Sequence, residues 1–308
     1  MSLHVFANFV TPYGTAANNR AETEGNITTL QKLLWQDETH STVSAEAIRF
    51  ALRRRLAESE GEGSNRSWDE DERVNSWKDP SFKGWASEKG KTFVDDDLLG
   101  YMIAEAAKED GSDDGKGSAN VRRAVLEVTR AVSLTPWVGD VTFNAASPGA
   151  TPSAQKKGSN PVPYGTELHA TRYQYGIALT PERLRDKSRA STAIDALCNL
   201  GAVAGNHGRF LFDFSPDAVV IRITSDPAPR LLYCFGTPDG GKSVSADALA
   251  QRIKAGDVDP KELFVGVSDV DSELARQLKG TGVASVTGVK AACTAAKAHI
   301  NKSLGIKG

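Results

Sequence analysis

Residues 18–55 read NNRAETEGNITTLQKLLWQDETHSTVSAEAIRFALRRR, and they join a polar stretch to an amphipathic helix. Ser44 can accept a hydrogen bond from a free amide of the first helical turn, and Glu46 places an acid in that turn. Apolar residues then recur at spacings of three and four, which predicts one buried stripe along the helix. The stripe consists of Ala45, Ile48, Leu52 and Leu56.

Basic side chains lie next to this apolar stripe. Arg49 and Arg53 are four residues apart, with Arg54 and Arg55 beside them. A helix start preceded by small hydrogen-bond donors can bind an anion, and arginine forms paired hydrogen bonds with phosphate. The alternative is an ordinary helix with a solvated basic face, in which Glu46 pairs with Arg49.

The same stretch resembles a known family. Asn19-Arg20, residues 29–33 (TLQKL) and residues 39–49 (THSTVSAEAIR) are similar to the DevR-type backbone subunit of type I-B-like CRISPR Cascade complexes. That family consists of repeat-associated RNA-binding proteins with a modified RRM fold, and the similarity extends over most of the chain. The resemblance implies a non-catalytic subunit that lies in several copies along a guide RNA (crRNA) and supports pairing with the target strand. The partners it implies are guide RNA, the target nucleic-acid strand, copies of the chain itself in a filament, and other Cascade subunits.

Composition allows an RNA-binding surface only as a local patch. The 308 residues carry a formal net charge of −2, and acidic runs at 69–72 and 95–97 would offset a basic region elsewhere. The three aspartates of 95–97 could bind a metal, although acids at a helix start are the simpler explanation. No apolar run approaches the roughly 18 residues that a membrane helix needs, so no membrane contact is expected.

The cysteines and histidines indicate neither a zinc site nor a disulfide framework. Cys198, Cys234 and Cys293 are far apart, and the five histidines lack zinc-binding spacing. Isolated cysteines fit a reducing compartment, and no signal peptide is recognisable, so we expect a cytoplasmic protein without a cofactor.

The predicted elements fit an α+β fold with a ferredoxin-like RRM core. A strand at 3–10 followed by the arginine-bearing helix would open such a unit. Strict alternation at 171–179 predicts a second strand, with Tyr173 and Tyr175 in the core and Arg172 on the opposite face as an RNA contact. Other expected strands are 218–224, 230–235 and 262–267; expected helices are 98–106, one starting at 180–181, 190–204, 245–255, 271–279 and 289–304; and 121–134 is expected to be a helix running into a strand.

Two long insertions interrupt this single domain of residues 1–308. The first, about 58–96, holds Trp68, Trp77 and Trp85, which either dock the insertion onto the body or let a finger stack on bases. The second, 137–165, is rich in Pro, Gly, Ser and Asn and carries Lys156 and Lys157. Its composition predicts an exposed loop, and the family resemblance implies a thumb that crosses the guide. The expected arrangement is a palm with finger and thumb.

A glycine-bearing segment at 205–209 (GNHGR) is a further candidate RNA contact. Glycine permits close backbone approach, while Asn206, His207 and Arg209 offer donors; the alternative is a plain loop. The residues predicted to bind RNA are Asn18, Asn19, Arg20, His40, Ser41, Thr42, Ser44, Arg49, Arg53, Lys156, Lys157, Arg172, Asn206, His207 and Arg209, with no catalytic or metal-binding residue expected.

A competing motif keeps a different function open. Residues 236–243 (GTPDGGKS) fit the phosphate-loop pattern GxxxxGK[ST] between a predicted strand and a predicted helix. Two features count against this motif. Asp239 would place negative charge beside a phosphate, and the residues that follow Ser243 are too few for the multi-stranded parallel sheet of such folds. An NTP-binding enzyme acting through Lys242 and Ser243 is therefore the second hypothesis. A third is an interaction module whose basic helix binds an acidic protein.

Overall fold

The computed structural model describes residues 2–61, 63–87, 89–104, 119–145, 163–205 and 207–306, with the backbone alone described at 19–21, 104 and 119. Lys156, Lys157 and Asn206 therefore lie outside the described residues, and the side chains of Asn19 and Arg20 do too.

A large sheet forms the centre of the molecule, with β1 (His4–Val10) in its middle. β1 pairs antiparallel with β16 (Tyr173–Leu179) on one side and with β17 (Ala218–Thr224) on the other. The full strand order is β19-β18-β17-β1-β16-β12-β6-β5, and β11 also pairs with β16. The outer strands are β18 (Leu263–Val267), β19 (Val286–Thr287), β11 (Leu126–Val128), β12 (Ala131–Ser133), β6 (Glu38–Val43) and β5 (Lys32–Trp35).

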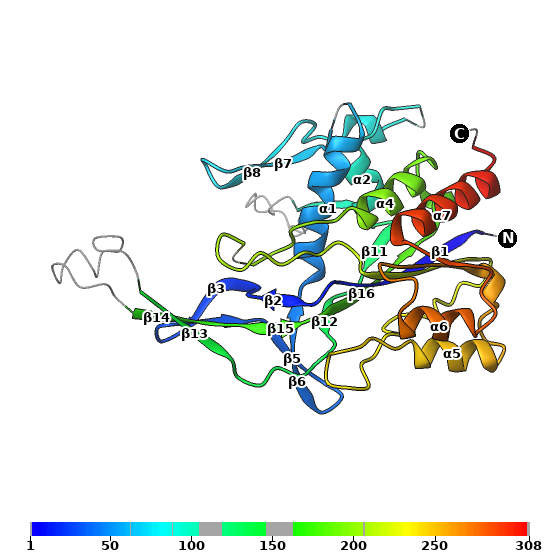
Figure 1. The fold of residues 1–308 in the computed structure, drawn as a ribbon. Coiled ribbons are helices and arrows are strands. Elements are labelled where there is room, and N and C mark those ends of the chain that lie inside the picture. Colours follow the sequence, from blue (N-terminus) through cyan, green and yellow to red (C-terminus); the bar gives the residue numbers. More distant parts are fainter. Residues whose placement is uncertain are drawn as a thin grey trace, which may run out of the picture.

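Helices cover both faces of this sheet (Figure 1). Val5, Ala7 and Phe9 of β1 are fully buried in the larger core, to which α1 (Ala45–Ser59), α2 (Val94–Leu99), α4 (Arg189–Cys198) and α7 (Val289–Leu304) contribute. Phe6 and Val10 point into the second core, beneath α5 (Asp247–Lys254) and α6 (Glu273–Lys279). Because burial of one large apolar side chain stabilises by about 1.5–3 kcal/mol, these two cores hold the layers together.

Two smaller sheets extend from the body as an arm (Figure 1). Four strands pair in the order β13-β14-β4-β3, and β2 pairs with β15 near the base of the arm. The two described ends of the segment 137–165, which was predicted as one long loop, contribute to two strands, because β13 and β14 pair antiparallel and β14 also pairs with β4. The arm strands are β2 (Gly14–Ala16), β3 (Asn19–Glu24), β4 (Ile27–Leu30), β13 (Val141–Ala145), β14 (Pro163–Glu167) and β15 (His169–Thr171).

A second projection follows α1. β7 (Arg66–Asp69) and β8 (Val74–Trp77) form an antiparallel hairpin, and β9 (Tyr101–Ala104) pairs antiparallel with β10 (Ala119–Arg122). Short 3-10 turns occur at Lys83–Trp85, Pro181–Arg183 and Pro260–Glu262. No helix in the described part of the chain is long and apolar enough to cross a membrane.

Several predicted elements are wrong. The helix expected at 98–106 is α2 at 94–99, and it ends because Gly100 adopts a positive φ of 66° before β9 begins. Residues 121–134 hold short strands and no helix, since pairing with β16 and β6 overrides local periodicity. Residues 230–235 form no strand, and α4 ends at Cys198 well before the expected residue 204.

The prediction of isolated cysteines is also wrong. Cys198 and Cys293 form a disulfide that joins α4 to α7, although 95 residues separate them in the sequence. The two helices pack side by side, and Lys297 of α7 forms an ion pair with Asp195 of α4 one turn away. Cys234 is a free thiol buried in the other core.

Candidate nucleic-acid interface

Helix α1 forms as its sequence predicts. The Ser44 hydroxyl accepts a hydrogen bond from the Ala47 amide at 3.2 Å, which satisfies one free donor of the first turn. Ile48, Leu52 and Leu56 are fully buried against the sheet. The predicted N-cap and apolar stripe are therefore confirmed.

Arg49 and Arg53, next to this apolar stripe, are held by the protein rather than freely solvated. A guanidinium nitrogen of Arg49 donates to the backbone carbonyl of Leu99, and Arg53 Nε lies 3.3 Å from Asp95 Oδ2. Burial lowers the pKa of both guanidinium groups from its ordinary value. The solvated basic face expected from the alternative interpretation is thus wrong for these two residues, because α2 covers part of them.

Three cavities follow this side of α1, and Phe50 borders each of them. The first, about 640 Å³, lies between α1 and the β9–β10 pair and is bordered by Arg49 and Arg53. The second, about 290 Å³, lies between α1 and the β7–β8 hairpin. The third, about 420 Å³, separates α1 from residues 200–205 and from His207. Other residues lining the first cavity include Arg66, Trp77, Tyr101, Met102, Val121 and Arg122.

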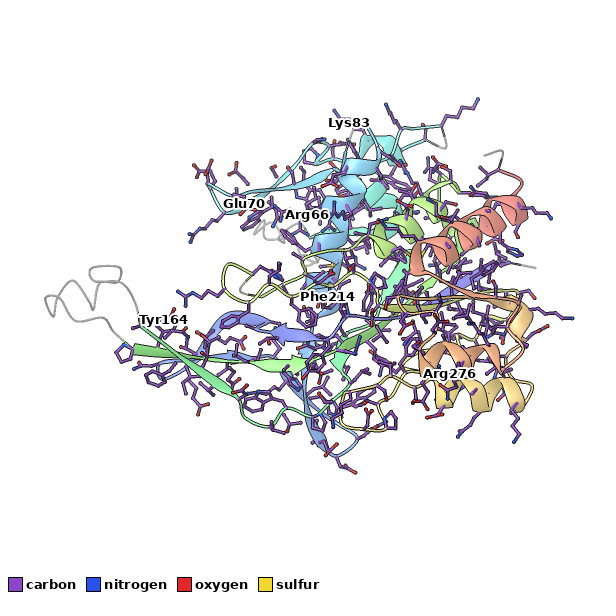
Figure 2. All side chains as sticks on the ribbon, viewed as in Figure 1. Arg66, Glu70, Lys83, Tyr164, Phe214 and Arg276 are labelled. Carbon is purple, nitrogen blue, oxygen red and sulfur yellow. A yellow bond between two sulfur atoms is a disulfide. The ribbon has the colours of Figure 1, made fainter. Side chains whose placement is uncertain are left out.

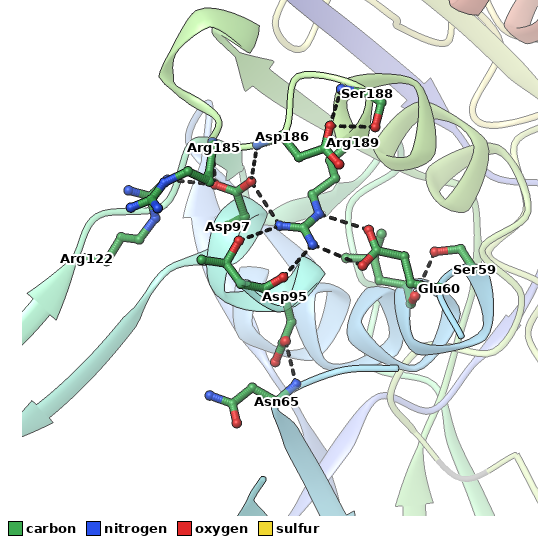
Figure 3. Close-up of polar contacts among 12 residues, drawn as sticks. Ser59, Glu60, Asn65, Asp95, Asp97, Arg122, Arg185, Asp186, Ser188 and Arg189 are labelled. Atoms are coloured by element: carbon green, nitrogen blue, oxygen red, sulfur yellow. Dashed lines mark hydrogen bonds and ion pairs between the residues drawn. The ribbon is translucent and has the colours of Figure 1, made fainter. Parts of the chain in front are cut away.

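Asp97 is the centre of a buried ionic network behind these cavities (Figure 3). Its fully buried carboxylate accepts hydrogen bonds from Arg122 Nη2 at 2.7 Å and Arg189 Nη1 at 3.1 Å. The backbone amides of Arg185 and Asp186 donate to the same carboxylate at 2.9 and 3.0 Å. The network therefore ties α2, α4 and β10 to one another.

The other two aspartates of the run 95–97 hold the start of the β7–β8 hairpin. Asp95 accepts hydrogen bonds from the backbone amides of Asn65 at 2.7 Å and Arg66 at 3.1 Å, besides its contact with Arg53. Asn65 Nδ2 donates to Asp96 Oδ2 at 2.9 Å. Burial and the neighbouring Asp95 raise the pKa of Asp96 to about 7. No cluster of metal-binding side chains occurs among the residues that the structure describes, and these acids instead have protein partners.

The predicted contacts on β6 lie inside the protein. The Ser41 hydroxyl is hydrogen-bonded to His169 Nδ1 and to the Tyr173 hydroxyl, each at 2.7 Å. Asn18 donates to the carbonyl of Thr42, and the Tyr173 hydroxyl donates to Asn18 Oδ1 at 3.2 Å. Burial lowers the pKa of His169 to about 4, so this network contains a neutral imidazole at neutral pH.

His40 belongs to the same buried layer. Its Nδ1 donates to the Ser133 carbonyl at 2.7 Å, and its side chain is almost entirely buried. Thr42 Oγ1 accepts from Arg130 at 3.2 Å, so the hydroxyl-rich stretch joins β6 to its neighbours. Direct RNA contact by Asn18, His40, Ser41 and Thr42 stays a prediction, because these side chains are buried and hydrogen-bonded within the protein.

Arg172 is separated from the α1 cavities. Tyr173 and Tyr175 are fully buried, which confirms them as core residues, but the opposite face of β16 is covered as well. Arg172 therefore pairs with Asp217 and donates to the Thr11 carbonyl at 3.1 Å. It borders another cavity of about 370 Å³, together with Lys242.

Gly205 and residues 207–209, the described part of the segment 205–209, lie between α1 and the arm. Gly205 has a φ of +93°, and a Cβ there would come within 2.7 Å of the Ala17 carbonyl oxygen, so close backbone approach requires glycine. His207 borders the 420 Å³ cavity, and its Nδ1 accepts from the Phe212 amide at 3.4 Å. The Arg209 guanidinium lies 5.0 Å from the ring centre of Tyr164, which Figure 2 labels on the arm.

Only some of the residues that border the α1 cavities were predicted from the sequence. Arg49, Arg53 and His207 border the α1 cavities, while Arg172 lies elsewhere. Phe50 and Arg66 were missed, although the run Arg66-Ser67-Trp68 places basic and aromatic residues together in the first insertion. The β7–β8 hairpin places Arg66 and Trp68 next to α1, where both border the 290 Å³ cavity.

The structure does not support the phosphate-loop interpretation of residues 236–243. Asp239 Oδ1 accepts from the Ser243 amide at 2.8 Å, and Thr237 Oγ1 accepts from the Gly241 amide at 2.7 Å. Amides that would hold a phosphate are thus used by the loop's own side chains. Helix α5 begins only at Asp247, so Lys242 and Ser243 do not open a helix.

Comparison with known proteins agrees with the family resemblance. Residues 13–199 match the family model described as CRISPR-associated negative auto-regulator DevR/Csa2. The chain belongs to this family. A relative from Myxococcus xanthus (strain DK1622), described as CRISPR-associated protein Cas7/Cst2/DevR, is 63% identical over 298 residues, covering 96% of this chain and 97% of the relative.

Solved structures of low sequence identity share the fold. One chain, from a structure titled CRISPR RNA-guided surveillance complex, pre-nicking, matches with a TM-score of 0.55 at 14% identity and covers 95% of this DevR/Csa2 family member and 100% of its own length. A second, titled CRISPR RNA-guided surveillance complex, gives a TM-score of 0.55 at 15% identity with 95% and 99% coverage. The predicted α+β class is confirmed.

Proposed function

We propose that this DevR/Csa2 family member is a non-catalytic backbone subunit of a cytoplasmic CRISPR surveillance complex, in which several copies bind the phosphate backbone of one guide RNA. Family membership and the likeness to chains of RNA-guided surveillance complexes support this role. The observation that carries it is the pair Arg49 and Arg53, which lie on one side of α1 at the border of a cavity of about 640 Å³.

The mechanism is electrostatic and independent of sequence. Arg49 and Arg53 are anchored on their protein side by Leu99 and Asp95, so little side-chain entropy is lost when a phosphate binds. Arg66 and Arg122 line the same cavity, so its four arginines outnumber its three carboxylates, which belong to Glu46, Asp95 and Asp96. Contacts to phosphate carry no base information, which leaves base edges free to pair with a target strand.

The finer architecture of the proposal is one RRM-like domain with a finger and a thumb. The order β1-α1-β11-β16-α4-β17 along the chain follows the β-α-β-β-α-β pattern, and β17, β1, β16 and β11 are neighbours in that sequence within the sheet. In this proposal the β7–β8 hairpin is the finger and the β13–β14 arm is the thumb. Lys156 and Lys157 belong to the segment between β13 and β14 and would contact the guide from there.

The test is guide binding by the double variant Arg49→Ala/Arg53→Ala. Fluorescence anisotropy with two guide RNAs of unrelated sequence, over a series of NaCl concentrations, should show equally weakened binding to both. The slope of log K against log salt should fall by about 0.7 for each phosphate of the single strand that the variant no longer neutralises.

Arg276→Ala is the matched control, because Arg276 lies on α6 in the opposite helical layer (Figure 2). It should bind both guides with the wild-type salt slope. A double variant that binds like the wild type at every salt concentration would refute the assignment. Native mass spectrometry on guides of increasing length tests the multiple copies, since the number of bound subunits should rise in steps with guide length.

A further inference from the structure

The disulfide between Cys198 and Cys293 joins the last residue of α4 to the early part of α7. Both residues are almost entirely buried, with 6% and 4% of their surface exposed. Disulfides are rare in a reducing cytoplasm, and those that form there are mostly transient or redox-sensing. In the cytoplasmic complex of the proposed function, such a bond is therefore expected to open and close.

Apart from this bond, α7 is attached to the body mainly by small side chains. The buried residues of α7 are Ala292, Cys293, Ala296 and Ile300. Only Ile300 among them is a large apolar residue, and the larger residues at the two ends, Val289 and Leu304, are partly buried. Burial stabilises in proportion to the apolar area removed from water, and an alanine contributes little. The covalent bond therefore accounts for an unusually large share of the attachment of α7.

The polar contacts between α4 and α7 add little to this attachment. Lys297 Nζ lies 2.5 Å from Asp195 Oδ1, but the two side chains are 32% and 56% exposed. Such a surface pair contributes little to stability. The Ser191 hydroxyl donates to Asn301 Oδ1, and the first turn of α7 has no side-chain cap. Once the disulfide is broken, α7 is thus an element that can open locally while the rest of the fold persists.

The position of α7 connects this opening to the rest of the molecule. α7 packs against β17 and β18 of the central sheet, and Figure 1 shows it beside α4. A Cβ at Gly266 of β18 would lie 2.7 Å from the Cα of Val289, so the helix and the strand are in close contact. From Cys198 the chain continues into residues 200–205, which border the 420 Å³ cavity beside α1. Release of α7 would therefore uncover part of the sheet and free the end of α4 next to that cavity.

The third cysteine does not compete for either partner. Cys234 lies in the other core, and burial raises the pKa of its thiol to about 12. Disulfide exchange proceeds by attack of a thiolate, which is scarce for such a thiol at neutral pH. The pair therefore changes between a bonded and a fully reduced state without forming a wrong disulfide within the chain.

We propose that Cys198 and Cys293 form a reversible redox switch, which fastens α7 to α4 when oxidised and allows α7 to open when reduced. The reductant is a low-molecular-weight thiol such as glutathione. Its thiolate attacks one sulfur to form a mixed disulfide, and the other cysteine leaves as a thiolate that takes up a proton. A second glutathione thiolate attacks the glutathione sulfur of the mixed disulfide, which frees the first cysteine. Two glutathione molecules thus supply two electrons and two protons and leave as glutathione disulfide.

Thiol labelling tests whether the bond is reversible. The full chain is equilibrated in buffers with different ratios of reduced to oxidised glutathione, precipitated with acid and labelled with N-ethylmaleimide in denaturant. Intact mass should show only Cys234 labelled in oxidising buffers and all three cysteines labelled in reducing buffers. Three labels in every buffer would show that the bond does not form. A single label even in reduced glutathione alone would show that the bond is permanent, and either result overturns the switch.

Hydrogen exchange followed by mass spectrometry tests the release of α7. Amides of residues 289–304 should exchange faster in the reduced than in the oxidised wild type, by roughly tenfold or more, while those of α5 in the other core stay unchanged. Cys198→Ser should resemble the reduced wild type in both buffers, and Cys234→Ala is the matched control that should keep the difference. Equal exchange of α7 in the two states of the wild type would overturn the proposal. Neither measurement uses guide RNA, so a failure of the proposed function is recognised separately, by the salt series on Arg49→Ala/Arg53→Ala.

Discussion

Asp97→Ala should cost much of the stability of this fold. The carboxylate is fully buried and accepts four hydrogen bonds, two from the guanidinium groups of Arg122 and Arg189 and two from backbone amides. Removing one partner of a buried ion pair leaves the other charge desolvated, which typically costs about 3–5 kcal/mol. Arg189 keeps its paired contacts with Glu60 at 2.9 and 3.0 Å, so we expect a value within that range rather than above it.

Urea unfolding followed by circular dichroism measures this destabilisation as a lower midpoint at an unchanged m-value. Glu58→Ala is the control, because Glu58 pairs with Arg55 at 2.9 Å on the surface, with side chains 65% and 44% exposed. That pair should contribute less than about 1 kcal/mol. If Asp97→Ala and Glu58→Ala lower the midpoint equally, the network around Asp97 is not a buried one and the reasoning fails.

Three further predictions concern single side chains. Burial raises the pKa of Asp96 from 3.8 to about 7, so the folded state disfavours its ionised form and stability should fall as pH rises through that window. Urea midpoints measured between pH 4 and pH 8 should therefore fall less steeply with pH in Asp96→Asn than in the wild type. Ser44→Ala should lower the free energy of unfolding by about 1 kcal/mol because the N-cap is removed, with Ser44→Thr as the cap-preserving control. Lys242→Ala should leave guide binding unchanged, and isothermal titration should detect no saturable ATP binding by the wild type; a wild-type signal that Lys242→Ala removes would contradict this.

Patterns within a short stretch of sequence correctly predicted the elements that depend mainly on residues close to one another in the sequence. Ser44 and the spacing of Ile48, Leu52 and Leu56 were sufficient for α1, since capping and apolar periodicity act within a few turns. Alternation predicted β16 equally well. Alternation distinguishes the two faces of a strand but does not reveal whether either is open to solvent. It therefore did not indicate that Arg172 pairs with Asp217, away from the α1 cavities.

Short strands and long-range pairing were beyond local reasoning. β11 and β12 have three residues each, too few for a period to be recognised, and their partners are on β16 and β6. The disulfide between Cys198 and Cys293 depends on packing of α4 against α7, which no spacing within the sequence encodes. The fold class was nevertheless predicted correctly, because it depends on the order of a few helices and strands with clear sequence patterns.

The aspartates at 95–97 show how one run of like charges can have several functions. Successive side chains on a helix point about 100° apart, so three neighbouring carboxylates face three different surroundings. Asp95 and Asp96 hold Asn65 at the base of the β7–β8 hairpin, Asp95 also holds Arg53, and Asp97 joins α4 to β10 through arginines. The hairpin and the arginine that border the proposed guide surface are thus positioned by the same short helix. It follows that Asp95→Ala should weaken guide binding as Arg53→Ala does, even though Asp95 itself carries the wrong charge to bind phosphate, while Asp95→Asn should retain part of the affinity by keeping an acceptor for the Asn65 amide.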